Sequence, residues 1–275
     1  QKDKKLGKKE KQSSFTDIIN KFNQDLLGET TEVSLPLNFK YRIHQIDLQN
    51  SKIVTKDQKH YQLIIKFKNV DPLGEDILVN YYNDQDIRMT LMTMQLFNVL
   101  HTIWCENDLN LKMSLYDVMT TSRNKGLIQL IPDTQIFDEM PVKETAGYKN
   151  LFGKRSLRKN LTLNSGISPE EVYNNFISSN VAFCVANYVL GVTQRNKKNI
   201  HFKKNGEIFY TQYEHLLNHY SKINGDRGIP FFFNITFVDF LSEKEERYKL
   251  FKELFEKAYF ILRNKSKDII GLIRS

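Results

Sequence analysis

The sequence predicts an α+β protein with a β-rich N-terminal lobe and a helical C-terminal lobe. Residues 33–82 are predicted to be strands, because YQLIIKFKNV alternates apolar and polar side chains and this period of two is typical of strands. From Asp86 onward the apolar spacing changes to about 3.6 residues, which predicts a long amphipathic helix. A further helix over residues 168–190 becomes apolar on nearly every side after residue 180, as expected of a helix buried at the centre of a lobe.

The composition supports a folded protein of this size. The chain has 275 residues, 40% of them hydrophobic and 12% aromatic, so it is globular and long enough to bury a substantial core. We predict a basic flexible arm over residues 1–14, an N-lobe over 15–132 and a C-lobe over 133–275, the two lobes forming one domain.

The net charge of +8 is unevenly spread along the chain. Two segments are basic: an N-terminal arm, residues 1–11, and a later connector, Lys149–Lys159. Residues 1–11 contain six Lys against one Asp and one Glu, so they carry +4. Such an arm is either solvated or binds an acidic protein surface or an anionic membrane. It has no aromatic residue for base stacking, so no specific nucleic-acid partner is expected. The predicted partner-binding residues in the arm and in the later basic connector are Lys4, Lys5, Lys8, Lys9, Lys154, Arg155 and Arg158.

Local signals place the N-lobe elements in order. A short helix is predicted over residues 12–28, where Gly28 ends it. Strands follow, with a strong turn at DPLG (71–74). After the long helix, residues 109–132 predict a strand, a turn and a second strand.

The C-lobe begins with a helix start of known mechanism. Ser168 can cap, Pro169 suits the first helical position, and Glu171 completes a capping box. The Asn205-Gly206 pair predicts a hairpin turn between two short strands. Helices are predicted over 234–241 and 243–266.

The Cys and His residues predict neither disulfide nor metal. Cys105 and Cys184 stand in apolar helical surroundings, so we expect two buried free thiols in a reducing compartment. His215 and His219 lack a third ligand. No apolar run has transmembrane length. The protein is expected to be intracellular, either cytosolic or imported into an organelle such as the mitochondrion, and to need no cofactor.

Three stretches in order resemble one known family. They are NVDPLGEDILVNYYNDQDIRMTLMTMQLF (69–97), HTIWCENDLNLKMSLYDVMTTSRNKGLIQLIPD (101–133) and FCVANYVLGV (183–192). Together they resemble the catalytic domain of phosphoinositide 3-kinases, most closely the class II kind, over about residues 34–274. The resemblance implies a bilobal, protein-kinase-like fold.

The residues that carry the family's chemistry are replaced. Where the family has its phosphate-binding Lys the chain has Tyr82, and an Asp that helps to hold this Lys is Thr90. The catalytic Asp and His correspond to Gln194 and Asn196, and the metal-binding Asp corresponds to Gln212. The residues that keep the family pattern are Asp86, Arg88, Tyr116, Arg195 and Asn199.

These replacements predict an inactive kinase fold. Phosphoryl transfer depends on positioning and on neutralisation of phosphate charge by Lys and Mg²⁺. Amide oxygens, such as that of the vestigial ligand Asn199, supply no charge to a metal. Glu214 is the nearby carboxylate that could bind the metal in place of the missing Asp. The segment Gln129, Leu130 and Ile131 is a vestigial adenine hinge in the family alignment, or simply a packed strand.

The resulting functional hypothesis is a catalytically inactive phosphoinositide 3-kinase-like pseudokinase that acts as a structural or scaffold subunit. Its partners would be other subunits of a larger assembly, with an anionic membrane surface as a further partner of the basic arm. Two alternatives remain: a regulatory pseudokinase that binds nucleotide without Mg²⁺, and an active lipid kinase with relocated ligands.

Overall fold

The computed structural model describes residues 8–29, 32–55, 61–140, 157, 161–162, 165–192, 196–217, 231–242 and 244–274. The chain divides into two compact units. Unit 1 comprises residues 1–91 and 116–132, and unit 2 comprises residues 92–115 and 133–275. The described part of unit 1 is mostly sheet and that of unit 2 mostly helix, which confirms the predicted α+β class.

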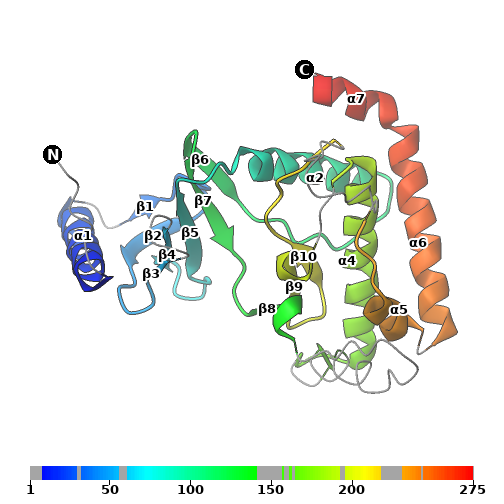
Figure 1. Cartoon of the computed structure of the whole chain (residues 1–275), viewed down its shortest axis with the longest axis horizontal. Coiled ribbons are helices and arrows are strands. Elements are labelled where there is room, and N and C mark those ends of the chain that lie inside the picture. Colours follow the sequence, from blue (N-terminus) through cyan, green and yellow to red (C-terminus); the bar gives the residue numbers. More distant parts are fainter. Residues whose placement is uncertain are drawn as a thin grey trace. The chain divides into compact units, whose positions relative to one another are not determined.

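Unit 1 is built on one antiparallel sheet (Figure 1). Its strands are β1 (Val33–Ser34), β2 (Arg42–Ile46), β3 (Lys52–Thr55), β4 (Tyr61–Asn69), β5 (Ile77–Asn83), β6 (Val118–Ser122) and β7 (Lys125–Leu130). Among the described residues the order is β1-β2-β4-β5-β7-β6, and β3 also pairs with β4. In the centre, Tyr82 of β5 is in register with Gln62 on one side and Gly126 on the other.

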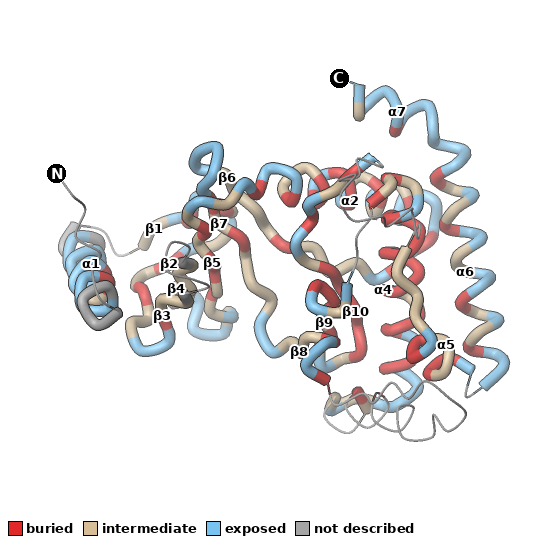
Figure 2. The backbone as a smooth tube through the Cα atoms, in the orientation of Figure 1, coloured by how far each residue is buried: buried red, intermediate tan, exposed pale blue. Residues whose placement is uncertain are grey.

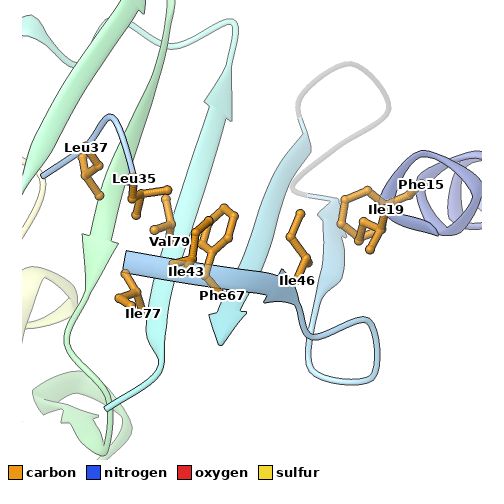
Figure 3. Packing of buried hydrophobic residues seen from close by; sticks show 9 residues of the cluster. All are labelled: Phe15, Ile19, Leu35, Leu37, Ile43, Ile46, Phe67, Ile77 and Val79. Atoms are coloured by element: carbon orange, nitrogen blue, oxygen red, sulfur yellow. The ribbon is translucent and has the colours of Figure 1, made fainter. Parts of the chain in front are cut away.

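Helix α1 (Lys8–Glu29) packs on this sheet along a narrow strip. Phe15 and Ile19 are buried in the same cluster as Ile46 (Figure 3). The amide of Asn23 donates from Nδ2 to the Ile46 carbonyl at 3.0 Å and accepts from the Ile46 N–H at 2.8 Å. The Asn23 side chain therefore bonds both backbone groups of Ile46, as a neighbouring strand would.

The start of α1 differs from the prediction of a flexible arm over residues 1–14. The helix begins at Lys8, although the sequence had predicted a helix only from residue 12. The reason is that Lys, Glu and Gln in KKEKQSS have helix propensities close to that of Ala, and no Pro or Gly interrupts them. Residues 1–7 lie outside the described part of the chain.

The predicted turn and helix that follow β4 are both confirmed. In DPLG the Gly74 N–H donates to the Asp71 carbonyl at 3.0 Å, which closes the turn between β4 and β5. Helix α2 (Arg88–Glu106) occupies the stretch where the apolar period changed to 3.6. Its buried residues Phe97, Leu100 and Trp104 recur at that spacing.

Unit 2 contains a small three-stranded sheet among its described residues, in the order β10-β9-β8. The elements are β8 (Thr134–Ile136), η1 (Phe137–Glu139), η2 (Lys197–Asn199), β9 (Ile200–Lys203) and β10 (Ile208–Tyr210). The predicted Asn205-Gly206 turn joins β9 to β10. Gly206 has φ 89°, and a Cβ there would lie 2.6 Å from the Val172 carbonyl oxygen, so the turn requires glycine.

Helix α4 (Pro169–Val189) is the centre of unit 2. The predicted cap is present, because the Ser168 hydroxyl accepts from the Glu171 N–H at 3.2 Å and Pro169 is the first helical residue. Most of its residues from Val172 to Asn187 are buried, as Figure 2 shows by the red course of α4. A helix apolar on nearly every side is buried in this way.

Three further helices complete the described part of unit 2. They are α5 (Ile235–Leu241), α6 (Glu245–Asn264) and α7 (Ser266–Arg274). Helix α6 packs along α4, where the Arg247 guanidinium lies 3.2 Å from the centroid of the Tyr173 ring and donates to Glu170 at 3.0 Å. The Trp104 indole of α2 donates to the Ala258 carbonyl of α6 at 3.0 Å. Helix α7 was not among the predicted elements.

The two cysteines differ in environment. Cys184 on α4 is fully buried, and burial raises the pKa of its thiol. Cys105 is exposed, so the prediction that both thiols are buried was wrong for this residue. It directly follows buried Trp104 on α2, and a one-residue step of about 100° turns its side chain towards solvent.

Candidate functional site

The positions aligned with the family's catalytic residues fall in both units. Unit 1 carries the positions that bind phosphate and adenine in the family, and unit 2 carries the loop positions that bind metal. Each half has its own geometry.

Tyr82 occupies the position of the phosphate-binding Lys. It lies on the central strand β5 and is 7% exposed. Burial raises the pKa of its phenol, so the side chain is neutral at any physiological pH. Tyr82 therefore contributes no positive charge, and its ring is part of the core of unit 1.

The turn from β5 into α2 contains the stretch that aligns with the family motif. Asp84 stands where the family has Gly and adopts a left-handed φ of 68°. Asp86 accepts from the Arg88 backbone N–H at 3.0 Å, from its Nε at 2.9 Å and from its Nη2 at 2.6 Å. These bonds to Arg88 lower the pKa of Asp86 to about 2. The two retained charged residues thus neutralise each other at the start of α2.

Thr90 and Tyr116 are both buried in unit 1, each 5% exposed. Thr90 stands on α2 where the family has the Asp that helps to hold the Lys. A hydroxyl carries no charge, so neutral, buried residues stand at both positions that the motif alignment assigns to the Lys and its acidic partner.

The predicted hinge residues lie at the end of β7 within the sheet. Gln129 and Leu130 pair with Val79 and Leu78 of β5. The Gln129 N–H donates to the Asp117 carbonyl at 2.8 Å. The Gln129 side chain donates to the Tyr41 hydroxyl at 2.9 Å and accepts from the Asp117 N–H at 3.1 Å. These bonds hold the strand in unit 1, and adenine binding at Gln129, Leu130 and Ile131 stays a prediction.

In unit 2 the loop residues Asn196 and Asn199 form a short, capped turn. The Asn196 side chain accepts from the Lys198 N–H at 2.9 Å and caps the 3-10 turn η2. Asn199 at its end is 8% exposed, and its carbonyl accepts from the Thr211 N–H at 2.9 Å. The structure therefore brings position 199 beside the Thr211–Gln212 segment. Gln194 lies outside the described residues.

Gln212, which the motif alignment matches to the family's metal-binding Asp, is exposed on a left-handed turn with φ 57°. Its neighbour Tyr213 is buried and meets the Phe97 ring edge to face at 5.4 Å. Glu214 is exposed. In the part of the chain that the structure describes, no group of three or more His, Cys, Asp or Glu side chains could hold a metal ion.

One residue beside this turn was not identified from the sequence. His201 of β9 contacts the Thr211 hydroxyl at 3.1 Å and stacks on Phe209 at 5.1 Å between ring centroids. Burial lowers the pKa of His201 to about 4, so the imidazole is neutral. The alternation in NIHF placed it on a strand, but no sequence signal connected it to position 212.

The predicted basic docking residues cannot be located in the same way. Lys4, Lys5, Lys154, Arg155 and Arg158 lie outside the described residues. Lys8 and Lys9 are in the first turn of α1, and their side chains also lie outside the described part. Within the described ranges, no helix combines the length and apolar character needed to cross a bilayer.

Known proteins similar to this chain are lipid kinases by name. Human phosphatidylinositol 3-kinase C2 domain-containing subunit gamma is 26% identical over 258 residues, which cover 91% of this chain and 17% of that protein. Human phosphatidylinositol 4-phosphate 3-kinase C2 domain-containing subunit beta is 29% identical, over 80% of this chain and 14% of that protein. Phosphatidylinositol 3-kinase 1 of Dictyostelium discoideum is 26% identical, over 86% of this chain and 15% of that protein. The chain thus matches less than a fifth of the length of each of these relatives.

The family itself is identified by a match over most of the chain. The sequence model of the family described as phosphatidylinositol 3- and 4-kinase matches residues 76–275, which include every aligned site position named above. This match confirms the resemblance carried by the three motif stretches. The chain therefore belongs to the phosphatidylinositol 3- and 4-kinase family.

Proposed function

We propose that the chain is a catalytically inactive phosphoinositide 3-kinase-like pseudokinase that works as a structural subunit of a larger protein assembly. The observation that carries the proposal is the neutral, buried Tyr82 at the position of the phosphate-binding Lys. A neutral side chain packed in the core brings no positive charge to a nucleotide.

The other replacements act in the same direction. Thr90, Gln194 and Gln212 are uncharged where the family has carboxylates. Loss of a single preorganised electrostatic group costs about 10²–10³ in rate. Several such losses together would reduce phosphoryl transfer to background, because this reaction depends almost entirely on positioning and charge neutralisation.

The retained charges do not replace what is missing. Asp86 is occupied by Arg88 through its own backbone and side-chain bonds. Glu214 is a single exposed carboxylate, whereas Mg²⁺ requires near-octahedral oxygen coordination. Asn199 and Gln212 would add only neutral amide oxygens.

Without catalysis, the family fold still offers stable surfaces for other proteins. The basic segments that contain Lys4, Lys5, Lys154, Arg155 and Arg158 would dock on acidic surfaces of neighbouring subunits or on an anionic membrane. We place this assembly inside the cell, in the cytosol or in an organelle such as the mitochondrion.

A lipid-kinase assay tests the inactivity. The chain is incubated with ATP, Mg²⁺ and vesicles that contain phosphatidylinositol or its 4-phosphate, beside the human gamma relative as a positive control. We expect no lipid phosphorylation above a no-enzyme blank, and no change in Glu214→Ala or Gln212→Ala. Mg²⁺-dependent turnover that falls about tenfold or more in Glu214→Ala would show an active kinase with a relocated ligand.

The structural role is tested separately by native size. The endogenous protein is tagged, purified under mild conditions, sized and analysed for stoichiometric partners. We expect a large complex that survives moderate salt. A particle of monomer size would contradict the structural role, and ATP binding unaffected by EDTA would then favour the nucleotide-binding alternative.

A further inference from the structure

Two exposed apolar side chains stand at the tips of two loops of unit 1. Leu73, in the turn between β4 and β5, is 97% exposed. Phe39, in the loop before β2, is 76% exposed. A single exposed apolar residue needs no explanation, but two large ones at adjacent tips form a candidate interaction surface.

Both tips lie at the same end of the sheet. The strands β2 and β4 are antiparallel, with Ile43 opposite Asn69, and the Val70 N–H donates to the Arg42 carbonyl at 3.0 Å. Phe39 precedes Arg42 by three residues and Leu73 follows Val70 by three. The start of β2 therefore lies beside the end of β4, and the two loops project from the same end of the sheet.

The Phe39 loop is held by its own bonds. The Leu35 N–H donates to the Tyr41 carbonyl at 2.8 Å, and the Asn38 side chain donates to Asp117 at 2.9 Å. Leu35 and Leu37 of this loop are buried in the sheet core (Figure 3). Phe39 stays outside while these two leucines fill the interior.

The Leu73 turn is held in the same manner. The Leu73 N–H donates to the Asp71 carboxylate at 2.9 Å, and the Asp71 N–H donates to the Asn69 side chain at 2.9 Å. The Asn69 amide in turn donates to the Glu75 carbonyl at 3.1 Å. Exposure of Leu73 is thus imposed by a bonded turn.

The charges beside the two tips have opposite signs. Lys40 adjoins Phe39, whereas Asp71 and Glu75 flank Leu73, and all three are exposed. None of the three forms an ion pair with another described residue. Nearby Lys68 is already paired with Asp76 at 2.8 Å and with Asp47 at 3.3 Å.

We propose that these two tips, Phe39–Lys40 and Asp71–Glu75, form a surface on which a second copy of the chain docks. A two-fold axis would set Phe39 of one copy against Leu73 of the other, because a two-fold interface repeats each contact reciprocally. The same operation brings Lys40 towards the acids Asp71 and Glu75 of the other copy, twice per dimer. The surface is therefore complementary to itself in both apolar character and charge.

A lipid surface fits these charges less well. The two tips together carry one unpaired cation and two acids, whereas insertion into an anionic membrane is favoured by cations around the apolar residues.

The proposed dimer interface would be small. A stable one buries about 800 Å² per partner, and two large side chains supply only part of that area. The association is therefore weak and depends on concentration. It does not depend on whether the chain is catalytically inactive.

Sedimentation of the purified chain over about 1–200 µM tests the proposal, a range that covers weak dimer affinities. We expect a reversible monomer–dimer equilibrium whose Kd rises about tenfold or more in Leu73→Ser and in Phe39→Ser. Ile235→Ser, which alters an exposed apolar residue of unit 2, is the matched control and should leave the Kd unchanged. A chain that is monomeric throughout, or a dimer insensitive to both tip variants, would overturn the proposal.

A charge exchange tests the pairing itself. Lys40→Glu and Glu75→Lys should each weaken the dimer, and the double variant should recover most of the affinity, because the two charges would meet across the axis. A double variant no stronger than the single ones would contradict the two-fold arrangement. Vesicles of phosphatidylcholine and phosphatidylserine supply the last arm: binding by a monomeric chain that is lost in Leu73→Ser would assign the tips to lipid instead.

Discussion

The positions aligned with the family's catalytic residues differ in environment between the two units. In unit 1 the charged positions are now Tyr82 and Thr90, both buried in the core. In unit 2 the aligned positions Asn196 and Gln212 are polar and exposed, and Gln212 lies on a left-handed turn. The aligned positions of unit 1 lie in its interior, whereas these positions of unit 2 are exposed. Reversal to the family residues should therefore be costly in unit 1 and tolerated in unit 2.

The largest expected effect is that of Tyr82→Lys. The ammonium would be buried at the centre of the sheet without an acid, since Thr90 replaces the family's Asp. An uncompensated buried charge destabilises by about 3–5 kcal/mol. Urea denaturation measures this loss, and Tyr82→Phe, which keeps the ring, is the control and should lose about 1 kcal/mol or less. Equal losses in the two variants would contradict the placement of Tyr82 in the core.

A gain in stability is expected at Asn187, a polar side chain buried in the core of unit 2. Asn187 on α4 is fully buried, and neither atom of its amide has a hydrogen-bond partner among the described residues. Replacement by Leu should raise the free energy of unfolding by about 1–2 kcal/mol, because an unpaired buried polar group is removed.

Asn175 is the matched comparison on the same helix. Its Nδ2 donates to the Asn205 carbonyl at 2.8 Å, so Asn175→Leu should lower the free energy of unfolding. If both variants shift stability in the same direction, the difference in hydrogen bonding does not decide their effects.

A smaller effect is expected from the Asp86–Arg88 pair of unit 1. The pKa of Asp86 is depressed to about 2, so its stabilisation is present above the unfolded pKa near 4 and is lost as the pH falls from about 4 to 2. Because the carboxylate is partly exposed, solvent screening limits the effect of Asp86→Asn to about 1 kcal/mol or less. Denaturation curves at pH 7 and pH 2.5 should show a clearly larger difference between wild type and Asp86→Asn at the higher pH.

The smallest effect is expected at Gln212. Gln212→Asp changes an exposed side chain on an existing turn, so stability should shift by about 0.5 kcal/mol or less. Thermal denaturation of Gln212→Asp beside Tyr82→Lys compares the two halves directly. A large loss at Gln212, comparable with that at Tyr82, would mean that both halves have been absorbed into the core.

The sequence predicted those parts of the fold that depend on local chemistry. Ser168, Pro169 and Gly206 mark a cap and a turn through their own backbone requirements, and each stands where it was predicted. The start of α1 and the exposure of Cys105 were predicted incorrectly. The start of α1 was predicted from charge, whereas helix propensity decides it. The burial of Cys105 was predicted from the apolar character of its surroundings, whereas its angular position on the helix decides it.

For the site, the sequence predicted which residues stand at the aligned positions but not their environments. The motif alignment identified Tyr82 and Gln212 as replacements, but not that one is buried and the other exposed. Strand β5 is covered on both faces, so Asn80 and Tyr82 are buried beside Val79 and no simple alternation reveals it. The hinge bonds between Gln129, Asp117 and Tyr41 join residues far apart in sequence, which no local pattern encodes.

The Asn23 amide that bonds both backbone groups of Ile46 has a consequence for solubility. A strand with unpaired N–H and C=O groups is a template on which other chains can add, and proteins avoid aggregation by covering such edges. Helix α1 meets this need with a side chain instead of a further strand, because an amide offers a donor and an acceptor at the right spacing. The helix whose lysines suggested a docking arm therefore also protects the sheet against uncontrolled polymerisation.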